Sequence, residues 1–287
     1  GAKPVFIDSE YDSWNMCPEA LKEALLHFSS QGTLDKVKAI IPVHLYGVPA
    51  RMNEIMKMAD EYGIPVVEDA AESLGATLNN KHTGTFGDFG VYSFNGNKII
   101  TTSGGGALIS NDSDKIQLAR KLATQARDDA PHYQHSMIGY NYRISNICAG
   151  IGRGQMEVIN ERIKQRRANF ERYLKIFEEL GWKAEYQIER EGVFANRWLS
   201  AFYFNPEAFG AKFREELRLF LETLNIESRP LWKPMHLQPV YENHQYFGKM
   251  NSAEKIFDFG LCLPSGSNLT EKEWDRIELA LNEFSER

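Results

Sequence analysis

The first half of the chain alternates between short apolar runs and segments whose apolar residues recur at helical spacing. The spacing is clearest at Met52, Ile55, Met56 and Ala59, which we interpret as a stripe that packs on a sheet rather than as a sulfur-rich ligand site. Alternation of this kind predicts a parallel α/β sheet flanked by helices. The expected strands are residues 4–7, 37–43 and 64–68, and the expected helices are residues 18–28 and 51–62.

A long helix is expected in the middle of the chain. Ser145 is a suitable N-cap for it, and Gly181 is suited to its C-terminal end. We predict that this helix links a large domain, residues 1–155, to a smaller α+β domain, residues 156–287, which includes most of the helix. Within the smaller domain we expect a strand at residues 198–204 and helices at residues 213–224 and 271–284.

Two charged residues follow the apolar runs of the large domain. Lys98 lies between the β-rich run 90–94 and the glycine-rich turn 101–106, and Asp69 ends the run 64–69. In such sheets ligands gather beyond the carboxyl ends of the strands. Pyridoxal phosphate chemistry requires this pair, because the lysine amine forms a Schiff base and the carboxylate keeps the ring nitrogen protonated. Taken singly, Lys98 could be a solvated loop residue and Asp69 an N-cap for residues 70–72.

Composition excludes several classes of protein. The net charge of -6 and the pI near 5.7 argue against a nucleic-acid partner, although a local cationic pocket for a small anion is compatible with them. The three cysteines show no CxxC spacing, so we expect neither disulfides nor a metal site, and a reducing cytoplasm. No apolar stretch approaches the roughly 20 residues of a membrane span, so we expect no membrane partner.

Four ordered motifs carry a resemblance to a known family. They are VHLYG at residues 43–47, VEDAAE at 67–72, YSFNGNK at 92–98 and GYNYR at 139–143. Over nearly its whole length the chain resembles the DegT/DnrJ/EryC1/StrS sugar aminotransferases, which are fold-type I enzymes dependent on pyridoxal 5'-phosphate. Residues 227–236 and 260–267 look like the branch that acts on UDP-linked 4-keto sugars in bacillosamine and polysaccharide synthesis.

The resemblance implies a role for each of five residues. Lys98 would form the Schiff base, Asp69 would face the pyridine nitrogen, and Glu72 would lie on the O3′ side of the cofactor. Glu72 shares a face with Asp69 if the segment after Asp69 is helical. Ser93 would donate to the cofactor phosphate, and Asn141 would reach that phosphate from the neighbouring subunit. A homodimer with a shared active site is therefore expected.

The remaining implications concern the substrate and the first residues of the fold. Arg229 and His236 would approach the nucleotide-linked keto sugar, and glutamate would be the amino donor. Residues 1–155 would bind the cofactor. Family members begin with a further segment that carries a Gly/Thr/Ser phosphate loop, and a chain starting at Gly1 is expected to lack it.

Three alternatives to transamination stay open at this point. A truncated, non-catalytic domain or partner subunit would keep the same fold without a complete cofactor site. A dehydratase acting on sugars is less favoured, because such relatives carry histidine where Lys98 stands. A Rossmann oxidoreductase is weaker still, because residues 104–106 lack the G-x-G-x-x-G spacing.

Overall fold

The computed structural model describes residues 1–287 and contains mixed sheets and helices. The helices are α1 (Pro18–Ser30), α2 (Met52–Tyr62), α3 (Ser113–Ala123), α4 (Asn146–Glu157), α5 (Ile159–Glu179), α6 (Pro206–Phe209), α7 (Phe213–Thr223), α8 (Ser252–Phe259) and α9 (Glu271–Ser285). The strands are β1 (Phe6–Ile7), β2 (Val67–Asp69), β3 (Thr77–Leu78), β4 (Lys81–His82), β5 (Phe89–Ser93), β6 (Gly106–Ile109), β7 (Val193–Phe194), β8 (Ser200–Tyr203), β9 (Arg229–Pro230), β10 (Tyr246–Phe247) and β11 (Gly260–Leu263). Four 3-10 turns are η1 (Leu34–Lys36), η2 (Leu45–Gly47), η3 (Met235–Leu237) and η4 (Pro239–Tyr241).

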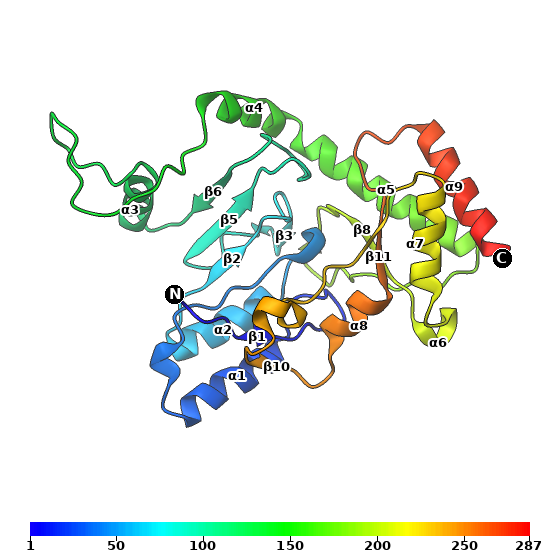
Figure 1. Cartoon of the computed structure of the whole chain (residues 1–287), viewed down its shortest axis with the longest axis horizontal. Helices are drawn as coiled ribbons and strands as arrows, with labels where there is room; N and C mark the ends of the chain where they lie inside the picture. The colour runs from blue at the N-terminus through cyan, green and yellow to red at the C-terminus, as the bar shows by residue number, and fades with distance from the viewer.

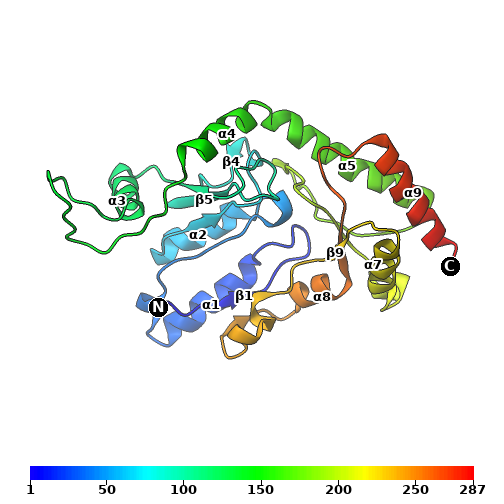
Figure 2. The same cartoon turned by 45° about the horizontal axis from the view of Figure 1, so that its top comes forward.

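The elements form two groups joined along one side. Figure 1 shows α1, α2 and the β2, β5, β6 sheet in one group and α7, α9, β8 and β11 in the other. Figure 2 shows α4 and α5 running across both groups as a bridge. None of these helices combines the length and the apolar character that crossing a bilayer requires.

The sheet nearest the candidate residues is mixed rather than wholly parallel. Strand β2 pairs parallel with β5, and β5 pairs antiparallel with β6. The expected strand at residues 37–43 is reduced to isolated parallel bridges of Ile40 with Val66 and Val43 with Asp69. The ladder is interrupted because Pro42 has no N–H, although its carbonyl still accepts from the Asp69 N–H at 2.9 Å.

The long helix predicted from Ser145 is two helices that meet at Val158. The N-cap is confirmed, since the Ser145 hydroxyl accepts from the Cys148 N–H at 3.2 Å. Helices α4 and α5 pack against different neighbours. A Cβ added at Gly152 of α4 would contact the Thr102 side chain. The Ile163 side chain of α5 lies instead against Gly75, in the turn before β3. The backbone of Val158, at φ −113° and ψ 10°, leaves the helical region and lets each helix follow its own contact.

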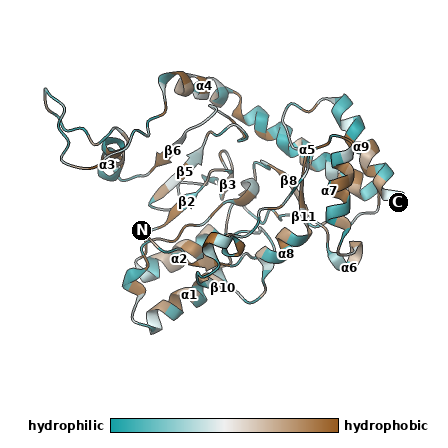
Figure 3. Ribbon diagram, in the orientation of Figure 1, coloured by the Kyte–Doolittle hydropathy of each residue, from teal (hydrophilic) through white to brown (hydrophobic).

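Three buried clusters hold the molecule together. One cluster lies among α5, α7, α9, β8 and β11 and is rich in aromatic rings, and another lies among α1, α2, β3 and the segment that leads into β2. The remaining cluster joins the two groups through Tyr46, Ile99, Trp198, Leu231 and Cys262. Figure 3 shows the matching pattern, with hydrophobic residues on β11 and hydrophilic residues along much of α5. The proposed boundary between residues 155 and 156 falls inside α4 and stays a prediction.

Candidate active site

The candidate site centres on Lys98, in the loop that follows β5. Its Nζ lies 3.6 Å from Glu72 Oε1 and 4.2 Å from the centre of the Trp198 ring. The Lys98 and Glu72 side chains are only 13% and 12% exposed, so the pair is largely withdrawn from water. The Trp198 ring is itself fixed, because its Nε1 donates to the Asn97 carbonyl at 2.9 Å.

Glu72 reaches Lys98 from a turn rather than from a helix. The condition for a shared helix face with Asp69 is not met, because the Asp69 carboxylate accepts from the Ala71 N–H at 3.1 Å and closes a turn. Glu72 Oε2 accepts from the Tyr46 N–H at 2.7 Å, and Oε1 accepts from Trp232 Nε1 at 3.3 Å. Burial raises the pKa of Glu72, although the Tyr46 N–H and the Lys98 charge oppose that rise.

Asp69 and Ser93 lie at the carboxyl ends of neighbouring strands. Asp69 of β2 is in register with Val91 of β5, so Ser93 lies two residues farther along the adjacent strand. Both side chains are half-buried. The Ser93 hydroxyl oxygen accepts from the Asn95 N–H at 3.3 Å, which leaves its own hydrogen free for another acceptor.

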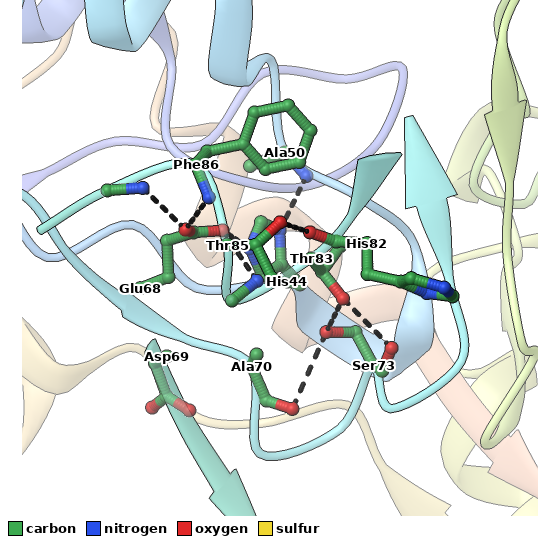
Figure 4. A network of polar contacts seen from close by, with 12 residues as sticks. His44, Ala50, Glu68, Asp69, Ala70, Ser73, His82, Thr83, Thr85 and Phe86 are labelled. Carbon is green, nitrogen blue, oxygen red and sulfur yellow. Dashed lines mark hydrogen bonds and ion pairs between the residues drawn. The ribbon is translucent and has the colours of Figure 1, made fainter. Parts of the chain in front are cut away.

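A second carboxylate, Glu68, was missed by the sequence reasoning. It is completely buried, and its Oε2 lies 3.0 Å from His44 Nε2. His44 Nδ1 accepts from the Ala50 N–H at 3.0 Å, so the ring is neutral with its hydrogen on Nε2, donated to Glu68. Figure 4 shows this network and shows the Asp69 carboxylate pointing away from it. The alternation of side chains along a strand was the signal that could have identified Glu68 as the inward residue.

Glu68 also organises the loop between β4 and β5. Its two oxygens accept from three backbone N–H groups at 2.7, 2.5 and 2.7 Å, those of Gly84, Phe86 and Gly87. Burial alone would raise the pKa of Glu68, but the hydrogen bonds from His44 and from the loop hold it below its usual value. The ionised carboxylate thus ties the loop to the strand that carries Asp69.

Two further residues, Tyr46 and Trp232, close the site. Both lie in segments that carry the resemblance, residues 43–47 and 227–236, where the sequence assigned them no specific role. Tyr46 is fully buried, and its hydroxyl oxygen accepts from the Trp232 N–H at 2.8 Å. Burial raises the pKa of Tyr46 well above its ordinary value. The ring centres of Tyr46 and Trp232 lie 5.4 Å apart. Together with the Trp198 ring, these two rings surround the Lys98 and Glu72 pair.

The structure does not bring the other predicted residues to Lys98. Arg229 is exposed on β9 and pairs with Glu227 at 2.5 Å. His236 in η3 stacks on Tyr246 at 3.9 Å, and its Nε2 lies 3.0 Å from Glu254. Their substrate roles stay predictions.

Asn141 is exposed in the segment between α3 and α4. Its backbone is bridged to that of Thr124. Figures 1 and 2 show this segment projecting away from the rest of the molecule. Asn141 makes no hydrogen bond or ion pair with Lys98 in this chain, and its role toward the cofactor of a second copy stays a prediction.

The side chains fit a group that carries an aldehyde, a ring nitrogen and a phosphate. Lys98 supplies an amine, Asp69 supplies a carboxylate, and Ser93 supplies a hydroxyl with an uncommitted hydrogen, all beyond the ends of two adjacent strands. No group of three or more His, Cys, Asp or Glu side chains is arranged to hold a metal ion. The site therefore has the donors for pyridoxal phosphate.

Comparison with known proteins gives matches along the whole chain. The profile of the DegT/DnrJ/EryC1/StrS aminotransferase family matches residues 1–282. EpsN of Bacillus subtilis, whose name describes a pyridoxal phosphate-dependent aminotransferase, is 49% identical over 291 residues, covering 99% of this chain and 72% of that protein. GDP-perosamine synthase of Escherichia coli O157:H7 is 36% identical over 286 residues, covering 99% and 73%.

A solved structure is similar over the full chain. The crystal structure of a DegT DnrJ EryC1 StrS aminotransferase from Brucella abortus superposes with a TM-score of 0.88 at 28% identity, covering 100% of this chain and 74% of that one. The predicted fold class is confirmed by this match.

Proposed function

Because this chain belongs to the DegT/DnrJ/EryC1/StrS aminotransferase family, we propose that it moves an amino group from glutamate to the C4 keto group of a nucleotide-linked sugar. Family membership makes the protein a pyridoxal phosphate-dependent aminotransferase, so the predictions of enzyme class and cofactor are confirmed. The sugar, the donor and the nucleotide are our proposal. The resemblance of residues 227–236 favours UDP, while the similarity to a GDP-perosamine synthase makes GDP the alternative to test.

One contact carries the proposal: the Lys98 amine beside the buried Glu72 carboxylate at 3.6 Å. When bound, pyridoxal phosphate supplies an aldehyde and an electron-accepting ring. Lys98 Nζ would attach the cofactor and, when free, take the proton from the α-carbon of the donor. Glu72 can accept a proton from Nζ, because burial has raised the pKa of its carboxyl. Asp69 would keep the ring nitrogen protonated, and Ser93 would donate to the phosphate.

The partner subunit is also part of the proposal. Asn141 lies on a projecting segment and would complete the phosphate site of a second copy. We therefore propose a homodimer with a shared active site, in cell-surface polysaccharide or glycan precursor synthesis. Arg229 and His236 would contact the nucleotide part of the substrate, since they flank Trp232 in the chain and Trp232 donates to Glu72.

The decisive experiment compares Lys98→Ala with Lys115→Ala. Lys115 is half-exposed on α3 and pairs with Asp112, so it is a matched loss of one lysine outside the site. After borohydride reduction with pyridoxal phosphate, we expect the intact mass of the wild type and of the control to gain one cofactor, and that of Lys98→Ala to stay unchanged. Turnover with glutamate and a UDP- or GDP-linked 4-keto sugar should fall about a thousandfold in Lys98→Ala.

Two results would count against the proposal. Cofactor attachment in Lys98→Ala would place the amine elsewhere. A wild type that binds no cofactor would support the alternative of a non-catalytic domain of the same fold.

A further inference from the structure

A cavity of about 490 Å³ lies beside the Lys98 pair, between α5, β9, β11 and the start of α9. Three of its lining residues belong to the surroundings of Lys98. Asn97 precedes Lys98 in the chain, the Trp198 ring lies under the Lys98 amine, and Trp232 donates to Glu72. The cavity therefore adjoins the reacting amine across a single aromatic ring.

Arg166 of α5 lines this cavity without an acidic partner. One terminal nitrogen, Nη1, donates to the Trp198 carbonyl at 2.8 Å. The Nε atom is buried and has no hydrogen-bond partner. No carboxylate offsets the charge, and burial lowers the pKa of Arg166 to about 10. An unpaired guanidinium in such a place is electrostatically costly, so an anion in the cavity would be held strongly.

The other charged groups around the cavity already have partners. Arg229 pairs with Glu227, and Glu273 closes the N-terminal cap of α9 with Thr270. Arg276 donates to the Leu224 carbonyl and also has an acidic neighbour, since the hydrogen bonds from Thr270 and the nearby Arg276 charge together lower the pKa of Glu273. One buried hydroxyl, that of Ser228, also lines the cavity and has no partner. The cavity thus presents one uncompensated positive charge and one free hydroxyl.

We infer that Arg166 and Ser228 form a subsite for the side-chain carboxylate of a dicarboxylic amino donor. The inference rests on the proposed function, in which such a donor places its amine at Lys98. A single positive charge matches a carboxylate better than a diphosphate, because the acidic Glu227 and Glu273 stand on the same cavity. Trp198 joins the two ends of the site, since its ring lies under Lys98 and its carbonyl accepts from Arg166.

The test compares Arg166→Met and Arg166→Lys with the control Arg162→Met. Arg162 lies one turn earlier on α5, and its guanidinium donates a hydrogen bond only to the Gln165 side chain. In the cofactor-loaded protein, we expect the glutamate concentration that half-converts the visible absorbance to rise about tenfold in Arg166→Met and less in Arg166→Lys. The corresponding concentration of alanine, which lacks a side-chain carboxylate, should stay unchanged in all variants.

A second readout does not depend on catalysis. Glutarate added to the cofactor-free protein should raise the melting temperature of the wild type and of Arg162→Met, but not of Arg166→Met. An Arg166→Met variant that responds to glutamate and glutarate as the wild type does would overturn the inference. An Arg166→Met variant that keeps glutarate binding but loses UDP binding would also overturn the inference, because the cavity would then be a phosphate site.

These outcomes separate the two proposals. If no amino donor converts the cofactor in the wild type while glutarate binding still depends on Arg166, the proposed function fails and the carboxylate subsite stands. If Arg166→Met unfolds, the same measurements are made on Arg166→Lys, which keeps the charge but removes the second donor of the guanidinium fork. Its response to glutamate and glutarate should then be weaker than that of the wild type, and an equal response would overturn the inference.

Discussion

Two neighbouring acids, Glu68 and Asp69, have different surroundings because a strand turns successive side chains to opposite faces. Glu68 points inward to His44 and three backbone N–H groups, and the Asp69 carboxylate points away from that network. Glu68 therefore acts on Asp69 through the strand they share. A loss of the Glu68 charge should loosen the loop and the strand together.

We expect Glu68→Gln to lower the free energy of unfolding by about 3 kcal/mol, because an amide cannot accept all four hydrogen bonds and its NH₂ faces donors. Urea denaturation at pH 7 measures the change. Glu54→Gln is the matched control, since Glu54 lies on the surface of α2 and pairs only with Arg51. Equal stability of the two variants would contradict the role given to Glu68.

The same carboxylate predicts a pH dependence of stability. The pKa of Glu68 is lower in the folded chain than in the unfolded one, so the ionised form stabilises the fold above the unfolded pKa of about 4.3. That contribution is lost as the pH falls through the lower, folded pKa. The difference in unfolding free energy between the wild type and Glu68→Gln should hence be constant above about pH 5 and shrink below about pH 4. A difference that grows in acid would contradict this assignment.

Local sequence was sufficient to propose Lys98 and Asp69, because Asp69 ends an apolar run and Lys98 lies in the short loop between such a run and a glycine-rich turn. It could not supply Trp198, nor the contacts through which Tyr46 and Trp232 close the site. The Trp232 N–H meets the Tyr46 hydroxyl across 186 residues, and the Trp198 ring nitrogen meets Asn97 across 101. Contacts of that separation depend on how two groups of elements pack, which periodicity does not reveal.

At the scale of elements, strand β5 packs so closely against the loop that precedes it that no side chain fits between them at Gly90. A Cβ at Gly90 would collide with the carbonyl oxygen of Gly84, in the loop that Glu68 holds. We expect Gly90→Ala to lower the unfolding free energy by about 2 kcal/mol, because the backbone on either side cannot move away.

Gly104→Ala is the control for this prediction. A Cβ there has no atom within 4 Å, so the change should stay within about 0.5 kcal/mol. Thermal or urea unfolding of both variants measures the effect. Similar losses in the two would show that the contact with Gly84 is not the constraint.

The helices were the elements that sequence predicted best. Helices α1, α2, α7 and α9 match the expected ranges to within two residues at each end, because an amphipathic repeat over ten or more residues is a strong local signal. The predicted strand at residues 37–43 was wrong, and the segment after Asp69 is a turn, so Glu72 does not share a helix face with Asp69. In each case a single residue is responsible. Pro42 has no backbone N–H to donate to the ladder, and the Asp69 carboxylate caps a turn.

At the scale of the whole molecule, the projecting segment and α4 expose large apolar side chains. Four of them are between 77% and 86% exposed, namely Tyr133, Ile138, Tyr142 and Ile147. We call these four the apolar arm. Exposed apolar surface of this extent is typical of a protein interface. The sequence motif at residues 139–143 indicated a shared site, but only the structure shows that Asn141 lies on the projecting segment that carries Tyr133, Ile138 and Tyr142.

We expect the double variant Ile138→Asp with Ile147→Glu to be monomeric, because burying two carboxylates in an apolar interface is strongly unfavourable. Sedimentation velocity measures the state of association. The variant should also bind pyridoxal phosphate more weakly, since Asn141 of the second copy would no longer reach the phosphate. Val240→Glu is the control, because Val240 is 74% exposed but lies on η4, outside the arm. A double variant that dimerises as the wild type does would exclude the arm as the interface, and weak cofactor binding in an intact dimer would separate Asn141 from assembly.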